Sequence, residues 1–348
     1  MKRSIIFSAI FAIILFSCKK DEDAVEDVVT SGPTPYNLVI PPNMPPMNIP
    51  ANNPMTVEGV ALGKKLFYDP ILSGDNTQSC ASCHSANFSF ASILQFSFGI
   101  DGMPTRRNSM PIVNLGWQPG FLWDGGAADL ESQVIGPITN PVEMHETLEN
   151  VLIELKEHPE YPTLFEAAFG EGEITIPKLM KAVAQFERTM ISANSKYDRY
   201  AAGQESLTPL EIQGLEFFTD MTKGDCNHCH VLGSTFSDFA YRNTGLDSIS
   251  FDDGRYAITL LESDRGKFKT PSLRNIELTA PYMHDGRFST LLECVEHYNT
   301  GFHYATNLDP NIAGLPKGRM SQQEMEAVVA FLLTLTDTEF INNPAFRP

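Results

Sequence analysis

The chain has 348 residues, of which 42% are hydrophobic, so it is long enough for two buried cores and too apolar for a disordered protein. Its formal net charge of -18 argues against nucleic acid as a partner and is compatible with a basic partner. Acidity also promotes solubility, so the charge alone does not identify that partner.

The N-terminus is typical of an exported protein. Two basic residues precede an apolar run over residues 4–17, which is too short for a membrane-spanning helix and predicts a signal peptide over residues 1–17. The run ends at Cys18 in a sequence that resembles the lipid-attachment site of bacterial lipoproteins. We therefore expect lipid attachment at Cys18 and a location on the periplasmic side of a membrane or on the cell surface. An ordinary signal peptide with an incidental cysteine is the alternative.

Residues 18–50 form the next segment. They are first acidic and then rich in Pro, Asn and Met, and they show neither a helical nor a strand period. This composition predicts a flexible stalk between the lipid and the folded part of the chain.

Two cysteine pairs carry the strongest signal in the chain. A histidine follows each pair at once, in Cys80-Ala81-Ser82-Cys83-His84 and in Cys226-Asn227-His228-Cys229-His230. C-x-x-C-H is the attachment signature of c-type haem, in which both thiols bind the porphyrin and the histidine binds the iron. A pooled zinc site and two redox disulfides are the alternatives, but both leave the two histidines unexplained. The remaining cysteine, Cys294, is expected to be buried and inert.

Helix signals accompany both motifs. Residues 63–67 precede the first motif and resemble residues 214–218 before the second, which indicates an internal repeat of one haem-binding unit. Capping boxes begin at Thr208 and at Ser321, and Pro177 opens an apolar series with a helical period.

No convincing alternating strand series is present, so the sequence predicts an all-α fold. We expect two cytochrome c-like domains, residues 51–203 and 204–348, each with one covalent haem c. The haem pair is expected to meet near the domain interface. The extreme C-terminus is expected to pack back on the first domain.

Further motifs extend from about Pro54 to the C-terminus. They are Arg107-Asn108 with the later Asn114, Phe121-Leu122-Trp123-Asp124-Gly125, Leu130-Glu131-Ser132-Gln133, Asn140-Pro141-Val142-Glu143-Met144, Thr270-Pro271-Ser272-Leu273-Arg274-Asn275 and Pro281-Tyr282-Met283-His284-Asp285-Gly286. Together with the haem motifs they resemble the diheme cytochrome c peroxidase and MauG family. The resemblance implies that peroxide binds at the N-terminal haem, held by His84, and that the C-terminal haem, held by His230, exchanges electrons with a donor.

The resemblance also implies an open iron position at the first haem. Many members of the family close that position with a histidine shortly after the haem motif, but no histidine occurs here between His84 and His145. Ile100 stands at the position of that ligand. We therefore predict a five-coordinate first haem that needs no prior reduction.

Three residues receive catalytic roles from the resemblance. Glu143 is expected to move a proton during cleavage of the O–O bond, and Gln133 is expected to orient it. Trp123 is expected to lie between the haems and relay electrons. The alternatives are a first-turn charge for Glu143 and an ordinary core residue for Trp123.

Two further metal environments follow from the resemblance. Asn108 and the backbone carbonyls of Thr279 and Pro281 match an inter-haem calcium site, and oxygen ligands suit Ca²⁺. Tyr298 matches the second ligand of the C-terminal haem iron in MauG-type members, and a phenolate stabilises high iron oxidation states. His297 and His303 are nearby competitors for that iron, since imidazole is also a haem ligand.

Three functions remain open at this point. The leading prediction is reduction of hydrogen peroxide to water with electrons from a small protein such as a cytochrome c. The second is MauG-like use of peroxide to oxidise a protein or organic substrate, and the third is a diheme electron carrier without catalysis. Homodimers are frequent in the family, and the resemblance extends that expectation to this chain.

Overall fold

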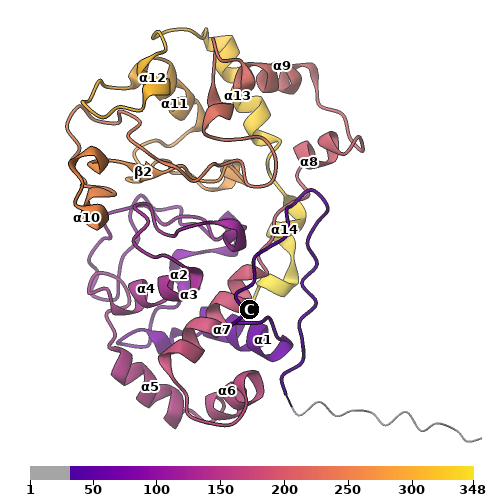
Figure 1. The fold of residues 1–348 in the computed structure, drawn as a ribbon, viewed down its shortest axis with the longest axis vertical. Helices are drawn as coiled ribbons and strands as arrows, with labels where there is room; N and C mark the ends of the chain where they lie inside the picture. Colours follow the sequence, from indigo (N-terminus) through magenta and orange to yellow (C-terminus); the bar gives the residue numbers. More distant parts are fainter. Residues whose placement is uncertain (1–31) are drawn as a thin grey trace, which may run out of the picture. The chain divides into compact units, whose positions relative to one another are not determined.

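The structure, a computed structural model, describes residues 32–348, which form one compact unit (Figure 1). The predicted signal peptide, Cys18 and the first part of the predicted stalk lie outside the described residues. The described part of the chain is mostly helical, with many short helices joined by long loops, and it contains no helix long and apolar enough to cross a membrane.

Two pairs of packed helices organise the fold. Helix α1 (Val57–Tyr68) packs on α7 (Ile176–Arg188), and α9 (Pro209–Thr219) packs on α13 (Gln322–Leu333), at opposite ends of the view in Figure 1. Both crossings need a glycine. A Cβ atom on Gly63 or on Gly214 would lie 1.9 Å from a backbone oxygen of the facing helix. The predicted repeat of residues 63–67 and 214–218 is therefore the same close helix crossing, made twice.

The helix starts follow the sequence signals. Thr208 and Ser321 both form the predicted capping boxes, in which the cap and the glutamate three residues later exchange hydrogen bonds. Helix α7 begins at Ile176 with Pro177 in its first turn, and the Thr175 side chain accepts a hydrogen bond from the Lys178 N–H. These three predictions are confirmed.

The remaining elements are short. The other α-helices are α2 (Cys80–Cys83), α3 (Leu130–Gln133), α4 (Ile135–Thr139), α5 (Leu148–Glu157), α6 (Tyr161–Phe169), α8 (Lys196–Ala201), α10 (Tyr256–Thr259), α11 (Leu291–Glu296), α12 (Pro310–Ala313) and α14 (Thr338–Asn342). A π-helix, η7, spans His297–Gly301, and 3₁₀ turns are η1 (Pro70–Leu72), η2 (Ala86–Phe88), η3 (Leu115–Trp117), η4 (Cys226–His228), η5 (Glu262–Asp264), η6 (Ile276–Leu278) and η8 (Pro344–Phe346).

One small sheet was not predicted from the sequence. Strands β1 (Tyr241–Arg242) and β2 (Phe268–Lys269) pair antiparallel, with Tyr241 opposite Lys269. A strand of two residues is too short to show an alternating pattern, so neither strand could be predicted. In Figure 1, β2 lies where the C-terminal half of the chain faces the N-terminal half.

The N-terminal end of the described chain packs on the body. The Tyr36 N–H donates to the Met55 carbonyl at 2.9 Å, the Asn43 side chain donates to the Ala193 carbonyl at 3.0 Å, and Met44 is buried. Met47 covers Gly116. This differs from the flexible stalk predicted over residues 18–50, because the methionines of this segment bury apolar surface and its polar groups find partners in the body.

The C-terminal end of the chain also packs on the N-terminal half. Phe340 of α14 and Phe346 of η8 lie edge-on to Phe90, with ring centroids 5.9 and 6.4 Å away. The Tyr68 hydroxyl at the end of α1 donates to the Phe346 carbonyl. The aromatic cluster beside the first cysteine motif is therefore built from both ends of the chain.

Candidate active site

The first histidine of the cysteine motifs is held by its own chain. His84 directly follows α2, and its Nδ1 lies 2.8 Å from the Phe90 carbonyl oxygen. Since a carbonyl only accepts, Nδ1 donates and Nε2 keeps its lone pair. Burial lowers the pKa of His84, which keeps the ring neutral. Cys80 and Cys83 are half-buried and form no disulfide.

The second histidine repeats this arrangement. His230 Nδ1 lies 3.2 Å from the Phe236 carbonyl oxygen, again six residues later, and burial lowers the pKa of His230 to about 4. Phe90 and Phe236 both have a positive φ, 57° and 51°. In this unusual backbone conformation the carbonyl of each phenylalanine faces the histidine ring of its motif. A neutral imidazole with a free Nε2 beside two free thiols fits a covalent haem at each motif. Within residues 32–348, no three His, Cys, Asp or Glu side chains gather as a metal site, which argues against the pooled zinc site.

The Glu143 carboxyl lies in a turn after α4. The Asn140 side chain donates to Glu143 Oε1 at 2.7 Å, while Asn140 Oδ1 accepts from the Val142 N–H at 3.2 Å. Burial raises the pKa of Glu143, and the bond from Asn140 opposes that rise. The turn is joined to the segment before the first cysteine motif, because the Gly74 N–H donates to the Met144 carbonyl at 2.9 Å.

The side chain that holds Glu143 was not identified from the sequence. Gln133, the predicted orienting residue, ends α3 half-buried, and its side chain forms no hydrogen bond with another described residue. Asn140 takes that contact instead. The spacing of an Asn three residues before a Glu could have suggested it, because Asn side chains commonly bond to the turn that follows them.

The loop that carries Ile100 packs directly on the Glu143 turn. The Ile100 N–H donates to the Glu143 carbonyl at 3.0 Å. Gly99 fits there only because it has no side chain, since a Cβ atom would lie 2.4 Å from the Val142 oxygen and 2.6 Å from the Glu143 oxygen. At the tip, His145 Nδ1 lies 2.6 Å from Asp101 Oδ2. The loop and the turn therefore form one rigid unit.

Trp123 lies between the two halves of the chain. Its indole Nε1–H donates to the Asn108 carbonyl at 2.9 Å, and its own carbonyl accepts from the Lys269 N–H at 2.7 Å. The Asn108 N–H donates to the His284 carbonyl at 2.7 Å, and the His284 ring lies edge-on to the indole at 6.5 Å. Trp123 is thus bonded to its own half through the indole and to the other half through its backbone carbonyl.

Tyr298 lies in the π-helix η7, a form that often marks a functional site. Burial raises the pKa of Tyr298, with the Cys294, Cys229 and Cys226 thiols as further causes. The competing His297 uses its Nε2 to bond the Thr244 carbonyl at 3.0 Å. His297 Nε2 therefore already has a backbone partner.

The predicted calcium ligands are three oxygens without hydrogen-bond donors. Asn108 and Thr279 are almost fully buried residues, Pro281 is half-buried, and the Asn108 amide nitrogen donates to the Leu94 carbonyl at 3.1 Å. Among the described residues, no group donates a hydrogen bond to Asn108 Oδ1 or to the carbonyls of Thr279 and Pro281. Oxygens of this kind fit a hard cation.

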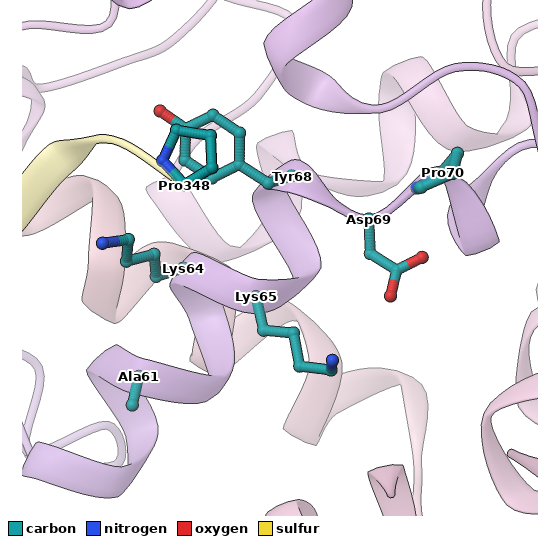
Figure 2. A pocket seen from close by; sticks show the side chains of 7 residues that line it. All are labelled: Ala61, Lys64, Lys65, Tyr68, Asp69, Pro70 and Pro348. Atoms are coloured by element: carbon teal, nitrogen blue, oxygen red, sulfur yellow. The ribbon is translucent and has the colours of Figure 1, made fainter. Parts of the chain in front are cut away.

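An open surface hollow lies apart from these residues. Lys64, Lys65, Tyr68 and Pro348 line part of it, as Figure 2 shows, and none of the predicted site residues does. The hollow is formed by the surface of α1, the two residues that follow it and the end of the chain.

Comparison with known proteins decides the family. A family described as di-haem cytochrome c peroxidase matches residues 57–206. The methylamine utilization protein MauG of Methylorubrum extorquens is 37% identical over 289 residues, which cover 82% of this chain and 80% of that protein. The chain belongs to the diheme cytochrome c peroxidase and MauG family. The cytochrome c551 peroxidase of Nitrosomonas europaea, also in this family, is 35% identical over 307 residues and covers 86% of both chains.

A solved structure supports the same assignment. A MauG-like protein associated with microbial copper homeostasis has a TM-score of 0.83 and 32% identity, over 89% of this chain and 98% of that one. The predicted family and enzyme class are therefore confirmed: the protein is a peroxide-dependent oxidoreductase of a family that binds haem c. The relatives include both peroxidases and MauG proteins, so the family alone does not choose between their two reactions.

Proposed function

We propose that the protein reduces hydrogen peroxide to water at the His84 site, with electrons supplied one at a time through the His230 site and Trp123. Two electrons and two protons convert one peroxide to two waters. The observation that carries the proposal is the half-buried Glu143 carboxyl, held by Asn140 in a turn that is hydrogen-bonded to the segment before the first cysteine motif. A haem bound there supplies the iron that holds peroxide and receives the electrons.

Glu143 handles the proton. Its carboxylate accepts the proton from the near oxygen of peroxide and returns it to the leaving oxygen, so that the leaving group departs as water. Burial supports this role, because a raised pKa brings the carboxyl closer to neutral pH, where it can both accept and donate. Asn140 keeps the carboxyl in one orientation.

Access to the His84 site needs no reductive step. The Ile100 loop is fixed to the Glu143 turn and carries no imidazole, so an aliphatic side chain stands at the family's closing position. The packing of Gly99 supports a loop that keeps this arrangement. We propose that a haem held by His84 would keep its opposite face open to peroxide in the resting enzyme.

A second candidate reaction is MauG-like oxidation of a protein or organic substrate. Tyr298 favours it, because a phenolate ligand would let the second site hold an oxidising equivalent.

The remaining parts of the proposal apply to both reactions. We propose two cytochrome c-like domains with the haem pair near their interface, and a calcium ion at Asn108, Thr279 and Pro281. Export with a lipid at Cys18 and a small electron-donor protein are further parts of it.

The stoichiometry of turnover tests the choice between the two reactions. With peroxide and a reduced small cytochrome c, a peroxidase oxidises two donor molecules for each peroxide consumed. Mass spectrometry of the enzyme and of added aromatic compounds follows the competing reaction. Two donors per peroxide and no new organic product would support the peroxidase, whereas oxidised organic product without donor oxidation would replace it with the MauG-like reaction.

A further inference from the structure

The interface between the halves contains a second internal repeat. The turns Phe121–Ala127 and Tyr282–Phe288 close with the same hydrogen bond, from the first N–H to the last carbonyl, at 2.9 and 2.8 Å. The second residue of each turn has a positive φ, 67° at Leu122 and 72° at Met283. Trp123 and His284 therefore occupy equivalent positions and face each other across the interface.

The two turns are held by reciprocal bonds. Asn108, fifteen residues before Trp123, donates its N–H to the His284 carbonyl at 2.7 Å. Lys269, fifteen residues before His284, donates its N–H to the Trp123 carbonyl, also at 2.7 Å. Each half thus gives the same bond to the other, and Asn108 and Lys269 are equivalent positions.

The equivalence extends to the proposed calcium ligands. Thr279 and Pro281 lie five and three residues before His284, and Gln118 and Gly120 lie five and three residues before Trp123. The Lys269 Nζ donates to Gln118 Oε1 at 2.7 Å and to the Gly120 carbonyl at 2.7 Å. An ammonium group is therefore present at the position equivalent to the calcium ion.

We infer that the Lys269 ammonium is a built-in counterpart of the calcium ion, and that Lys269 is a positioning residue for Trp123. The inference rests on the proposed function for both the calcium site and the Trp123 relay. As calcium would tie Asn108 to the turn that carries His284, Lys269 ties β2 to the turn that carries Trp123.

The surroundings of Lys269 support a cation with a specific task. Lys269 is only 2% exposed and forms no ion pair with any described carboxylate. Its nearest acid, Asp124, is paired with Arg107 at 2.5 Å. Burial lowers the pKa of Lys269 to about 8, so the amine is still mostly protonated at neutral pH. Burying a charge without a counter-ion lowers the stability of the fold. An apolar side chain at position 269 would be more stabilising if the side chain only filled space.

The contacts of β2 explain how Lys269 acts on the relay. The Lys269 Nζ bonds the Gln118 side chain, and the Lys269 N–H bonds the Trp123 carbonyl, so both ends of residues 118–123 are held. The neighbouring Phe268 stacks on the His284 ring, with the ring centroids 3.7 Å apart. Lys269 therefore holds the backbone that carries Trp123, and Asn108 holds the indole N–H. Each electron that Trp123 gives toward the first site is replaced by one from the second site, so the residue is unchanged after each transfer. A displaced indole would slow that transfer.

Calcium stoichiometry of the haem-loaded protein tests the equivalence. Chelator-treated protein is titrated with calcium alone and the bound ion is counted. We expect one ion in the wild type, two in Lys269→Asn, which copies the Asn108 position, and none in Asn108→Lys. Lys267→Asn, two residues earlier and paired with Asp264 at the surface, should keep one. Calcium should also raise the melting temperature of Lys269→Asn more than that of Lys269→Met. A folded Lys269→Asn protein that binds no additional calcium would overturn the equivalence.

Electron transfer between the two sites tests the positioning role. In stopped-flow experiments, Lys269→Met should transfer electrons about tenfold more slowly, as Trp123→Phe should, with an unchanged first reaction with peroxide. Lys267→Met should match the wild type. Unchanged transfer in Lys269→Met would overturn the role of Lys269. If the wild type binds no calcium, the proposed calcium site is contradicted. If the wild type does not react with peroxide, the proposed function is contradicted. In both cases the two Lys269 variants still test this inference.

Discussion

The surroundings of His84 and His230 have the same backbone arrangement but differ in the side chains placed around it. Both histidines bond the carbonyl of a phenylalanine six residues later, and both motifs lie beside a helix crossing that needs a glycine. The first site then adds the Glu143 turn, whereas the second adds Tyr298 in a π-helix. In the proposed function, the shared part attaches a haem and the part that differs assigns its chemistry.

Glu143→Gln should have the largest effect on this division of roles. An amide cannot accept the proton from peroxide, so we expect the rate of the first peroxide reaction to fall about 10²–10⁴-fold. The spectrum of the His230 site should stay the same. Stopped-flow absorbance measures both, and Glu149→Gln, on the exposed surface of α5, is the matched control. A normal rate in Glu143→Gln would mean that this carboxyl only stabilises the turn and takes no part in the reaction.

Tyr298→Phe should change only the second site. Loss of the phenol oxygen removes the proposed iron ligand, so one low-spin EPR signal should disappear while the first peroxide reaction keeps its rate. We expect the second site to lose most of its ability to hold an oxidising equivalent. If the low-spin signal persists unchanged in this variant, another residue binds that iron, and His297→Ala would then be examined.

Gly99→Ala should disturb the first site through its backbone. The added methyl group would meet the Val142 and Glu143 oxygens, so the Glu143 turn must shift, and we expect the peroxide reaction to slow by about tenfold. Gly136→Ala in α4, where a Cβ atom meets nothing within 4 Å, is the control. Equal rates in the two variants would mean that the loop does not position Glu143.

Asn140→Ala should produce the smallest effect, a change in pH dependence. The Asn140 bond lowers the pKa of Glu143, so its loss should raise that pKa further. The carboxylate is the form that accepts a proton, and it is lost as pH falls through the pKa of the folded enzyme. The acidic limb of the rate profile should therefore move to higher pH, with a several-fold loss of rate at mildly acidic pH. An unmoved profile would contradict the role of Asn140.

Local signals predicted the parts of the molecule that depend on neighbours in the chain. The haem motifs, the helix caps and the first repeat could be read directly, because each depends on residues a few positions apart. The placement of residues 32–50 was missed, since Pro, Asn and Met suit both a stalk and a strap whose partners lie far away in sequence. Lys269 gave no signal either, because its burial depends on Gln118 and Gly120 in the other half.

The resting spectrum tests the central claim that the first site is open. Optical and EPR spectra of the ferric enzyme, followed by one equivalent of peroxide without prior reduction, report both irons at once. The account predicts a high-spin signal from the His84 site that reacts immediately. Two low-spin signals that ignore peroxide until one electron is added would show that a side chain closes the first iron and that the reading of Ile100 is wrong.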